Sequence, residues 1–208
     1  MNTAPSSSLA LPGLRVLLAD AGQRRSPVIR LELIRLRCQL LDVLDLVAQP
    51  GALADALQRQ SPELLIVDCE QPSPALLTQL GDALRRQPRP VLLFAEQMSA
   101  TQMRDALQAG ISTLQLAGLP PQRLGALMQL ALARFEHDQS LQRDLRQTQT
   151  QLAERKLVER ARGILMREQG LDEEAAFQRL RQLAMDGGQT LAAVATRLID
   201  ADQLLRSR

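Results

Sequence analysis

Short apolar runs alternate with longer amphipathic stretches from Leu14 onward. The apolar runs predict five β-strands, at residues 14–19, 40–47, 63–68, 91–95 and 112–116. The amphipathic stretches between them predict helices that begin at Ser26-Pro27, Gly51, Pro74 and Ser99. Apolar strands that alternate with amphipathic helices form a parallel sheet covered on both faces. We therefore predict a flavodoxin-like α/β domain with a five-stranded parallel sheet over residues 14–133, after a flexible N-terminal segment at 1–13.

A fifth helix is predicted from Pro120-Pro121 onward, and it is unusually long because residues 126–162 contain neither glycine nor proline. Apolar side chains recur in it at spacings of three and four, which is typical of a coiled coil. Polar residues interrupt this series, and such layers favour two strands in a fixed register. We predict a parallel homodimer through residues 134–156, with a solvated linker helix as the alternative. The expected dimerisation residues are Leu141, Leu145, Thr148 and Leu152.

The apolar spacing broadens after Lys156 and predicts three short helices within residues 157–208. Gly170 is suited to end the first of them, because glycine adopts the left-handed conformation easily. Asp172 and Thr190 are expected to cap the second and third helices. Phe177 falls on the stripe of the second helix that we expect to be buried.

Composition adds few functional signals. The formal net charge of +2 is too small to indicate nucleic-acid binding by itself. No apolar run reaches about 18 residues and no secretory signal is present, so the cytoplasm is the expected location. Cys38, Cys69 and the lone His137 lack neighbours at metal-ligand spacing, and we expect neither a metal nor a cofactor. A signalling enzyme is disfavoured because the chain has no Gly-rich phosphate loop and no nucleophile with a paired base.

Residues 14–133 resemble the receiver domain of two-component response regulators. The resemblance places Asp68 at the phospho-acceptor position and leaves Asp20 as the only member of the acidic pair that would bind magnesium. The switch hydroxyl is replaced by Ala95, and the lysine-proline pair is replaced by Ala117-Gly118. We therefore expect a pseudo-receiver that takes its signal from another protein instead of from phosphorylation. The vestigial phospho-acceptor pocket would comprise Asp20, Asp68, Ala95 and Ala117.

Residues 153–205 resemble the ANTAR domain, an RNA-binding module of transcription antiterminators. The resemblance is carried by Ala161-Arg-Gly-Ile-Leu-Met166, Asp172 with Glu174-Ala175 and Phe177, Leu180-Arg181, Ala184-Met185, and Leu191 with Val194-Ala195. It implies a non-enzymatic dimer that binds paired stem-loops in a leader RNA and prevents a terminator hairpin from forming. With no Trp or Tyr, and with Phe177 expected in the core, arginines would have to stack on loop bases and contact phosphates. The expected RNA-binding residues are Arg160, Arg162, Met166, Arg167, Arg179, Arg181 and Gln189.

Segments of both halves also resemble antiterminators that respond to nitrate or nitrite. These segments are Gln87-Pro-Arg-Pro90, Gly110-Ile-Ser112, Ala133-Arg-Phe-Glu136 and Gln151-Leu-Ala-Glu-Arg-Lys156. The resemblance implies a nitrate- or nitrite-sensing partner, similar to a nitrate-binding protein, that sequesters the chain until the ligand arrives. A DNA-binding response regulator stays open as the alternative, since three helices can form a helix-turn-helix. The run Leu191-Ala-Ala-Val-Ala-Thr196 offers few base-contacting side chains for such a role.

Overall fold

The computed structural model of the chain describes residues 10–22, 25–49, 51–117 and 121–206. It divides into two compact units, Met1–Gln139 and Ser140–Arg208. No described helix is both long enough and apolar enough to cross a lipid bilayer.

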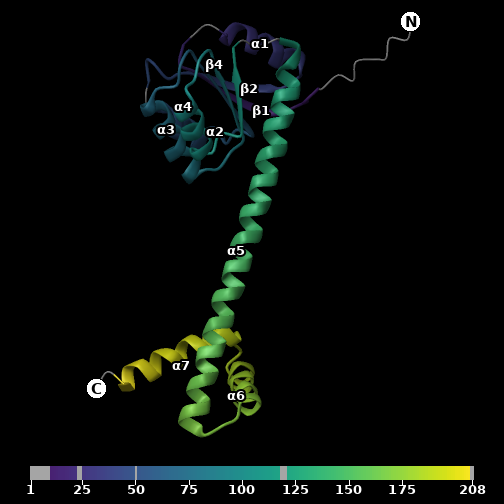
Figure 1. Cartoon of the computed structure of the whole chain (residues 1–208). Helices are drawn as coiled ribbons and strands as arrows, with labels where there is room; N and C mark the ends of the chain where they lie inside the picture. The colour runs from purple at the N-terminus through teal and green to yellow at the C-terminus, as the bar shows by residue number, and fades with distance from the viewer. Residues whose placement is uncertain (1–9, 23–24, 50, 118–120, 207–208) are drawn as a thin grey trace, which may run out of the picture. The chain divides into compact units, whose positions relative to one another are not determined.

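The N-terminal unit is built on a parallel sheet with the strand order β2-β1-β3-β4-β5 (Figure 1). This order confirms the predicted flavodoxin-like arrangement, and each observed strand lies within two residues of its predicted position. β3 and β4 are buried along their whole length because helices cover both faces of the sheet. The strands are β1 Arg15–Asp20, β2 Gln39–Asp45, β3 Leu64–Cys69, β4 Val91–Ala95 and β5 Thr113–Leu116.

Two hydrophobic cores lie on the two sides of this sheet. One core packs the strands against α2, α3 and α4, and includes Leu53, Leu80 and Ala106. The other packs them against α1 and the start of α5, and includes Ile29 and Met128. The first four helices are α1 Ser26–Arg35, α2 Ala52–Gln60, α3 Pro74–Arg86 and α4 Ala100–Gln108.

The helix starts follow the predicted signals with one exception. Gly51 is the N-cap residue of α2, and Ser99 caps α4 by accepting a hydrogen bond from the Gln102 amide. α1 begins at Ser26 as predicted, but it lacks the side-chain cap that a Ser-Pro start would favour. Arg25 is the N-cap residue and no side chain caps the helix. The Arg25 amide instead donates to the Asp68 carboxylate at 3.2 Å, so the start of α1 is held by a residue on β3.

Residues 10–13, part of the segment expected to be flexible, are attached to the end of α1. The Leu11 amide donates to the Leu36 carbonyl at 3.0 Å, and the Gly13 amide donates to the Arg37 carbonyl at 2.9 Å. Residues 1–9 of the same predicted segment lie outside the described part of the chain, as does Gly118.

The C-terminal unit consists of the later part of the fifth helix and two shorter helices (Figure 1). A short 3-10 turn at Pro121–Arg123 leads into α5, which is a single 46-residue helix at Leu124–Gln169, followed by α6 Glu173–Asp186 and α7 Leu191–Arg206. Gly170 has a φ of +65° after the end of α5. Asp172 accepts a hydrogen bond from the Ala175 amide at 2.7 Å, and Thr190 accepts one from the Ala193 amide at 3.2 Å. These contacts confirm the predicted ends and caps.

The core of the C-terminal unit is small. Its buried members are Ala161, Ile164, Leu165, Ala176, Leu180, Ala195 and Ile199. Phe177 is not among them. The prediction that Phe177 is buried is wrong, since its side chain is only half-buried and lines an open groove. The core includes three alanines, Ala161, Ala176 and Ala195, so the helices pack largely over small side chains.

Candidate functional sites

The predicted phospho-acceptor pocket is assembled at the carboxyl edge of the sheet. In the strand register Asp20 lies opposite Asp68, and Ala95 lies opposite Cys69. The amide of Ala117 donates to the Ala95 carbonyl at 3.2 Å, which places the end of β5 beside β4. The structure therefore brings the four predicted pocket residues together. Among the described residues, no group of His, Cys, Asp and Glu side chains has an arrangement that could hold a metal ion.

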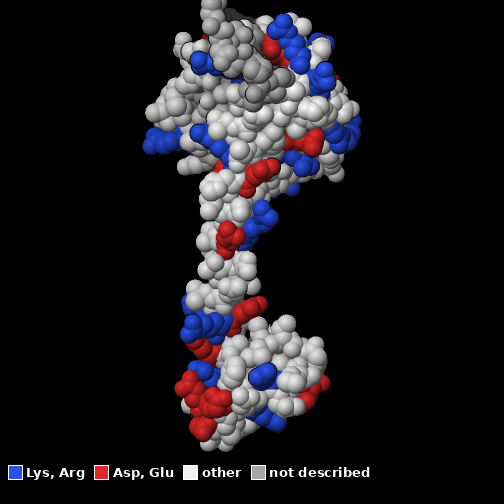
Figure 2. All heavy atoms as spheres, turned by 90° about the vertical axis from the view of Figure 1, so that its right-hand side faces the viewer, with Lys and Arg blue, Asp and Glu red and all other residues white. Residues whose placement is uncertain are grey.

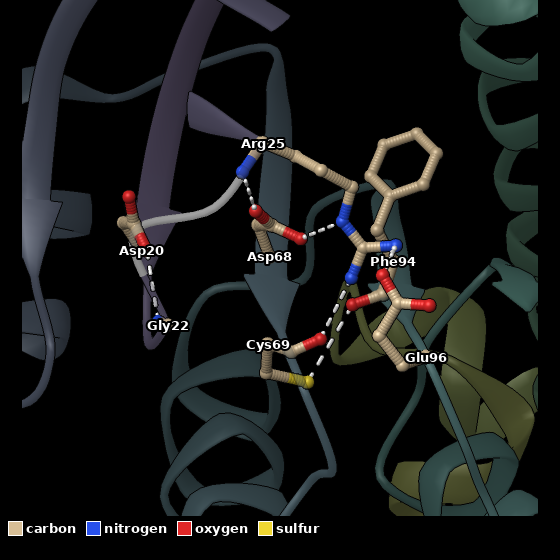
Figure 3. Close-up of polar contacts among 7 residues, drawn as sticks. All are labelled: Asp20, Gly22, Arg25, Asp68, Cys69, Phe94 and Glu96. Carbon is tan, nitrogen blue, oxygen red and sulfur yellow. Dashed lines mark hydrogen bonds and ion pairs between the residues drawn. The ribbon is translucent and has the colours of Figure 1, made fainter. Parts of the chain in front are cut away.

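Arg25 closes this pocket. Its Nε donates to Asp68 Oδ1 at 2.8 Å, and its Nη2 donates to the Cys69 carbonyl at 2.9 Å (Figure 3). Its Nη1 also lies 3.3 Å from Oε1 of Glu96, the residue after β4. One guanidinium thus joins the ends of β3 and β4 to the start of α1. The crevice that these residues line has no room for even a water-sized group.

Burial and charge act in opposite directions on the Asp68 carboxyl. Only 2% of the residue is exposed, and this desolvation raises its pKa above the ordinary value. The charge and hydrogen bonds of Arg25 oppose the rise, while the nearby charge of Asp20 adds to it. Burial likewise raises the pKa of the adjacent Cys69 thiol to about 12, so this thiol is protonated and unreactive at neutral pH.

Three of the predicted RNA-binding arginines are exposed and unpaired. Arg160 lies on α5, and Arg179 and Arg181 lie on α6. None of them forms an ion pair with an acidic side chain in the described part of the chain. Their guanidinium groups are therefore open to solvent and to an external anion.

Two other predicted RNA-binding arginines already have acidic partners. Arg162 Nη2 lies 2.8 Å from Glu173 Oε1, and the Arg162 side chain is only 29% exposed. Arg167 binds Glu168 and also reaches Asp202 on α7 at 2.9 Å. Either arginine would have to leave its partner to bind another ligand.

The remaining predicted residues of this set lie on the surface. Met166 is 37% exposed on α5. The Gln189 side chain, before α7, accepts a hydrogen bond from Arg197 Nη1 at 2.8 Å. Figure 2 shows that acidic and basic side chains alternate along one margin of the C-terminal unit, while most of the visible face is uncharged. A broad basic patch is therefore absent from this face, and binding to a polyanion would have to use a few local arginines.

The predicted dimerisation residues are also exposed. Leu141, Leu145 and Leu152 present more than half of their surface, and the Thr148 hydroxyl donates to the Asp144 carbonyl within the same helix. Leucines exposed at coiled-coil spacing leave an apolar stripe that the single chain does not cover.

Comparison with known protein families gives one match, to the ANTAR domain over residues 146–199. The matched span takes in the last part of α5, all of α6 and most of α7. The chain carries an ANTAR domain.

Two relatives extend this result. The transcriptional regulatory protein PdtaR of Mycobacterium tuberculosis is 25% identical over 185 residues, which cover 85% of this chain and 90% of the relative. A nitrate regulatory protein of Klebsiella oxytoca is 41% identical over 68 residues, which are 33% of this chain and 17% of that longer protein. The chain is thus similar to PdtaR across both units, and to the nitrate regulatory protein over a segment only.

Solved structures reproduce the N-terminal fold. A CheY-like response regulator receiver domain protein from Methanospirillum hungatei aligns with a TM-score of 0.51, at 15% identity, and covers 61% of this chain and 99% of that one. The likeness establishes a receiver-like fold for the sheet domain that precedes the ANTAR domain.

Sequence patterns do not reveal two features of these sites. Arg25 is separated from Asp68 by 43 residues, so no local signal predicts their contact. Met185 belongs to the motif that carries the ANTAR resemblance, but nothing in that motif marks it as a surface residue. It is 68% exposed one turn after Arg181 on α6, and exposure of a methionine does not follow from the spacing of one helix alone.

Proposed function

We propose that this chain is an RNA-binding transcription antitermination regulator. It acts as a dimer on paired stem-loops of a leader RNA and prevents an overlapping terminator hairpin from forming. The observation that carries the proposal is the ANTAR match over a three-helix unit whose surface arginines include several without acidic partners among the described residues. The similarity to a transcriptional regulatory protein over most of the chain supports the same function.

Arg160, Arg179 and Arg181 are the first candidates for RNA contact, because an exposed guanidinium can bind a phosphate or stack on a splayed base without breaking an internal pair. Met185 and Met166 offer apolar surface near such contacts. Gln189 is a further polar candidate. Arg162 and Arg167 are second candidates, since each would first have to leave an acidic partner.

Regulation is proposed to act through a protein partner instead of through phosphorylation. Asp68 is occupied by the Arg25 side chain, so a phosphodonor would have to displace a buried ion pair to reach it. A partner that senses nitrate or nitrite and sequesters the chain would supply the signal. The name of the Klebsiella oxytoca relative, which matches over 68 residues, supports nitrate as the signal class. Asp68→Asn is expected to leave this regulation intact, and loss of regulation in that variant would show that phosphorylation takes part.

The proposed function is tested by the choice between RNA and DNA. The purified full chain is titrated into a labelled two-hairpin leader RNA, and in parallel into duplex DNA of the same sequence, with fluorescence anisotropy as the readout. The proposal expects binding to the RNA alone, and readthrough of the terminator when the chain is added to transcription in vitro. Equal binding to both nucleic acids would favour a DNA-binding response regulator instead.

A further inference from the structure

An open groove runs along the C-terminal unit between α5, the start of α6 and the start of α7. Its apolar lining includes Val158, Phe177 and Leu191, and its charged lining includes Arg155, Glu159 and Arg162. Phe177 is the only aromatic residue after Phe135. Its ring is only partly buried by this chain and contributes apolar surface to the groove.

The groove continues the exposed stripe of α5. Leu141, Leu145, Thr148 and Leu152 follow one another at spacings of four, three and four residues. The same alternation, continued by three, four and three, reaches Arg155, Glu159 and Arg162. Because residues at this spacing stay on one face of a supercoiled helix, the stripe of leucines leads directly into the groove. The three leucines are 53%, 58% and 54% exposed.

The charges of the groove favour a protein over RNA. Glu154, Glu159 and Glu173 line it together with only two arginines, so its lining carries a net negative charge. Both arginines are already paired, Arg155 with Glu159 at 3.0 Å and Arg162 with Glu173 at 2.8 Å. A polyanion would meet the carboxylate of Glu154, which neither arginine compensates. A second helix with the same alternation of Arg and Glu would instead place its arginine beside a glutamate of the facing chain.

We propose that a second copy of this chain occupies the groove, so that the dimer interface extends from the coiled coil into the three-helix bundle. The inference rests on the proposed dimer and goes beyond it. The partner's α5 covers Phe177, Val158 and Leu191. In a parallel dimer Arg155 and Glu159 occupy successive layers, so Arg155 of each chain packs beside Glu159 of the other. Arg162 then belongs to the protein interface. Arg160 comes one residue after Glu159, so it lies about 100° round the helix from the stripe and stays open for RNA.

Charge reversal on the stripe tests the proposal. Glu159→Arg leaves only positive charge at positions 155 and 159, and Arg155→Glu leaves only negative charge there. Each variant alone is expected to raise the dimer dissociation constant at least tenfold, because like charges meet across the interface. Mixing the two variants, each with a different tag, is expected to restore a dimer that contains one chain of each kind. Sedimentation velocity and native mass spectrometry of the full chains measure both effects.

Two control variants test whether the effect of charge reversal belongs to this interface. Glu136→Arg makes the same change of charge at an exposed position of α5 away from the stripe, and should leave the dimer intact. Leu145→Asp breaks the coiled coil itself and should give monomers.

Three results would overturn the proposal in distinguishable ways. If Leu145→Asp gives monomers while both charge variants remain dimers, the coiled coil stands and the groove is not part of the interface. If Glu159→Arg strengthens RNA binding and leaves the dimer unchanged, the groove binds RNA. If the unaltered chain is a monomer, this proposal and the proposed dimer both fail. The RNA titration then shows separately whether the monomer binds RNA.

Discussion

One arginine of the receiver-like unit and three arginines of the ANTAR domain are held in opposite ways. In the receiver-like unit, Arg25 is 12% exposed and forms an ion pair with Asp68, which is 2% exposed. In the ANTAR domain, Arg160, Arg179 and Arg181 are exposed and have no acidic partner among the described residues. A buried charge must be satisfied from within the protein, since leaving it unpaired is costly. This difference explains why Asp68 is already engaged within the protein, while the three exposed arginines can bind an external anion.

The largest expected effect on stability comes from opening the sealed pocket. Arg25→Met removes the cation but keeps much of the side-chain volume, and leaves a buried carboxylate without its main partner. Losing one member of a buried pair typically costs about 3–5 kcal/mol. The free energy of unfolding, followed by circular dichroism in urea, should fall by an amount in this range.

A matched control for this variant lies at the end of α3. Arg85 pairs with Asp82, and both side chains are more than half exposed. Arg85→Met should therefore change the free energy of unfolding by less than about 1 kcal/mol. If the two variants cost the same, Arg25 does not hold the pocket closed.

The loss in the free energy of unfolding caused by Arg25→Met should depend on pH. Burial raises the pKa of Asp68 and Arg25 opposes that rise, so removing Arg25 raises the pKa further. A raised carboxyl pKa means that the folded state binds more protons than the unfolded state, so its stability falls as pH rises from the ordinary carboxyl value through the folded pKa. The deficit of the variant should accordingly be largest near pH 7 and shrink on acidification. The urea titration repeated at several lower pH values measures this trend. A double variant that also carries Asp68→Asn should show no such pH dependence. A pH dependence that persists in the double variant would mean that another group titrates.

A smaller effect is expected at the start of α6. Asp172→Ala removes the hydrogen bond to the Ala175 amide, and loss of such a cap costs about 1 kcal/mol. Hydrogen exchange should increase in α6, with little change in the sheet of the N-terminal unit. Asp200→Ala, which removes an exposed carboxylate from the surface of α7, is the control and should leave exchange in α6 as it was. Equal protection in both variants would show that the cap contributes little.

The sequence predicts the fold well where a signal is local. β3 and β4 are short apolar runs that cannot be stable unless both faces are covered, and Ser99 and Asp172 cap helices within three residues of themselves. The contact of Arg25 with Asp68 depends on the strand order bringing distant residues together, so no local pattern reveals it. The partial exposure of Phe177 depends on how the three helices pack together, which the spacing along one helix does not show. The pairing of Arg162 with Glu173 likewise becomes visible only when α5 and α6 are placed side by side.

The most direct test compares arginines of the two units in one RNA-binding experiment. A triple variant with Arg160, Arg179 and Arg181 changed to Ala is set against a control triple of Arg30, Arg86 and Arg104. The control residues are arginines of the receiver-like unit that lie on its helices, and both variants lose three positive charges. The affinity for the two-hairpin leader RNA is measured by anisotropy over a series of salt concentrations. We predict at least a hundredfold loss for the first variant with a shallower dependence on salt, and less than a threefold loss for the control. An equal loss in both variants would contradict RNA binding by the ANTAR domain, because the affinity would then follow the total charge of the chain.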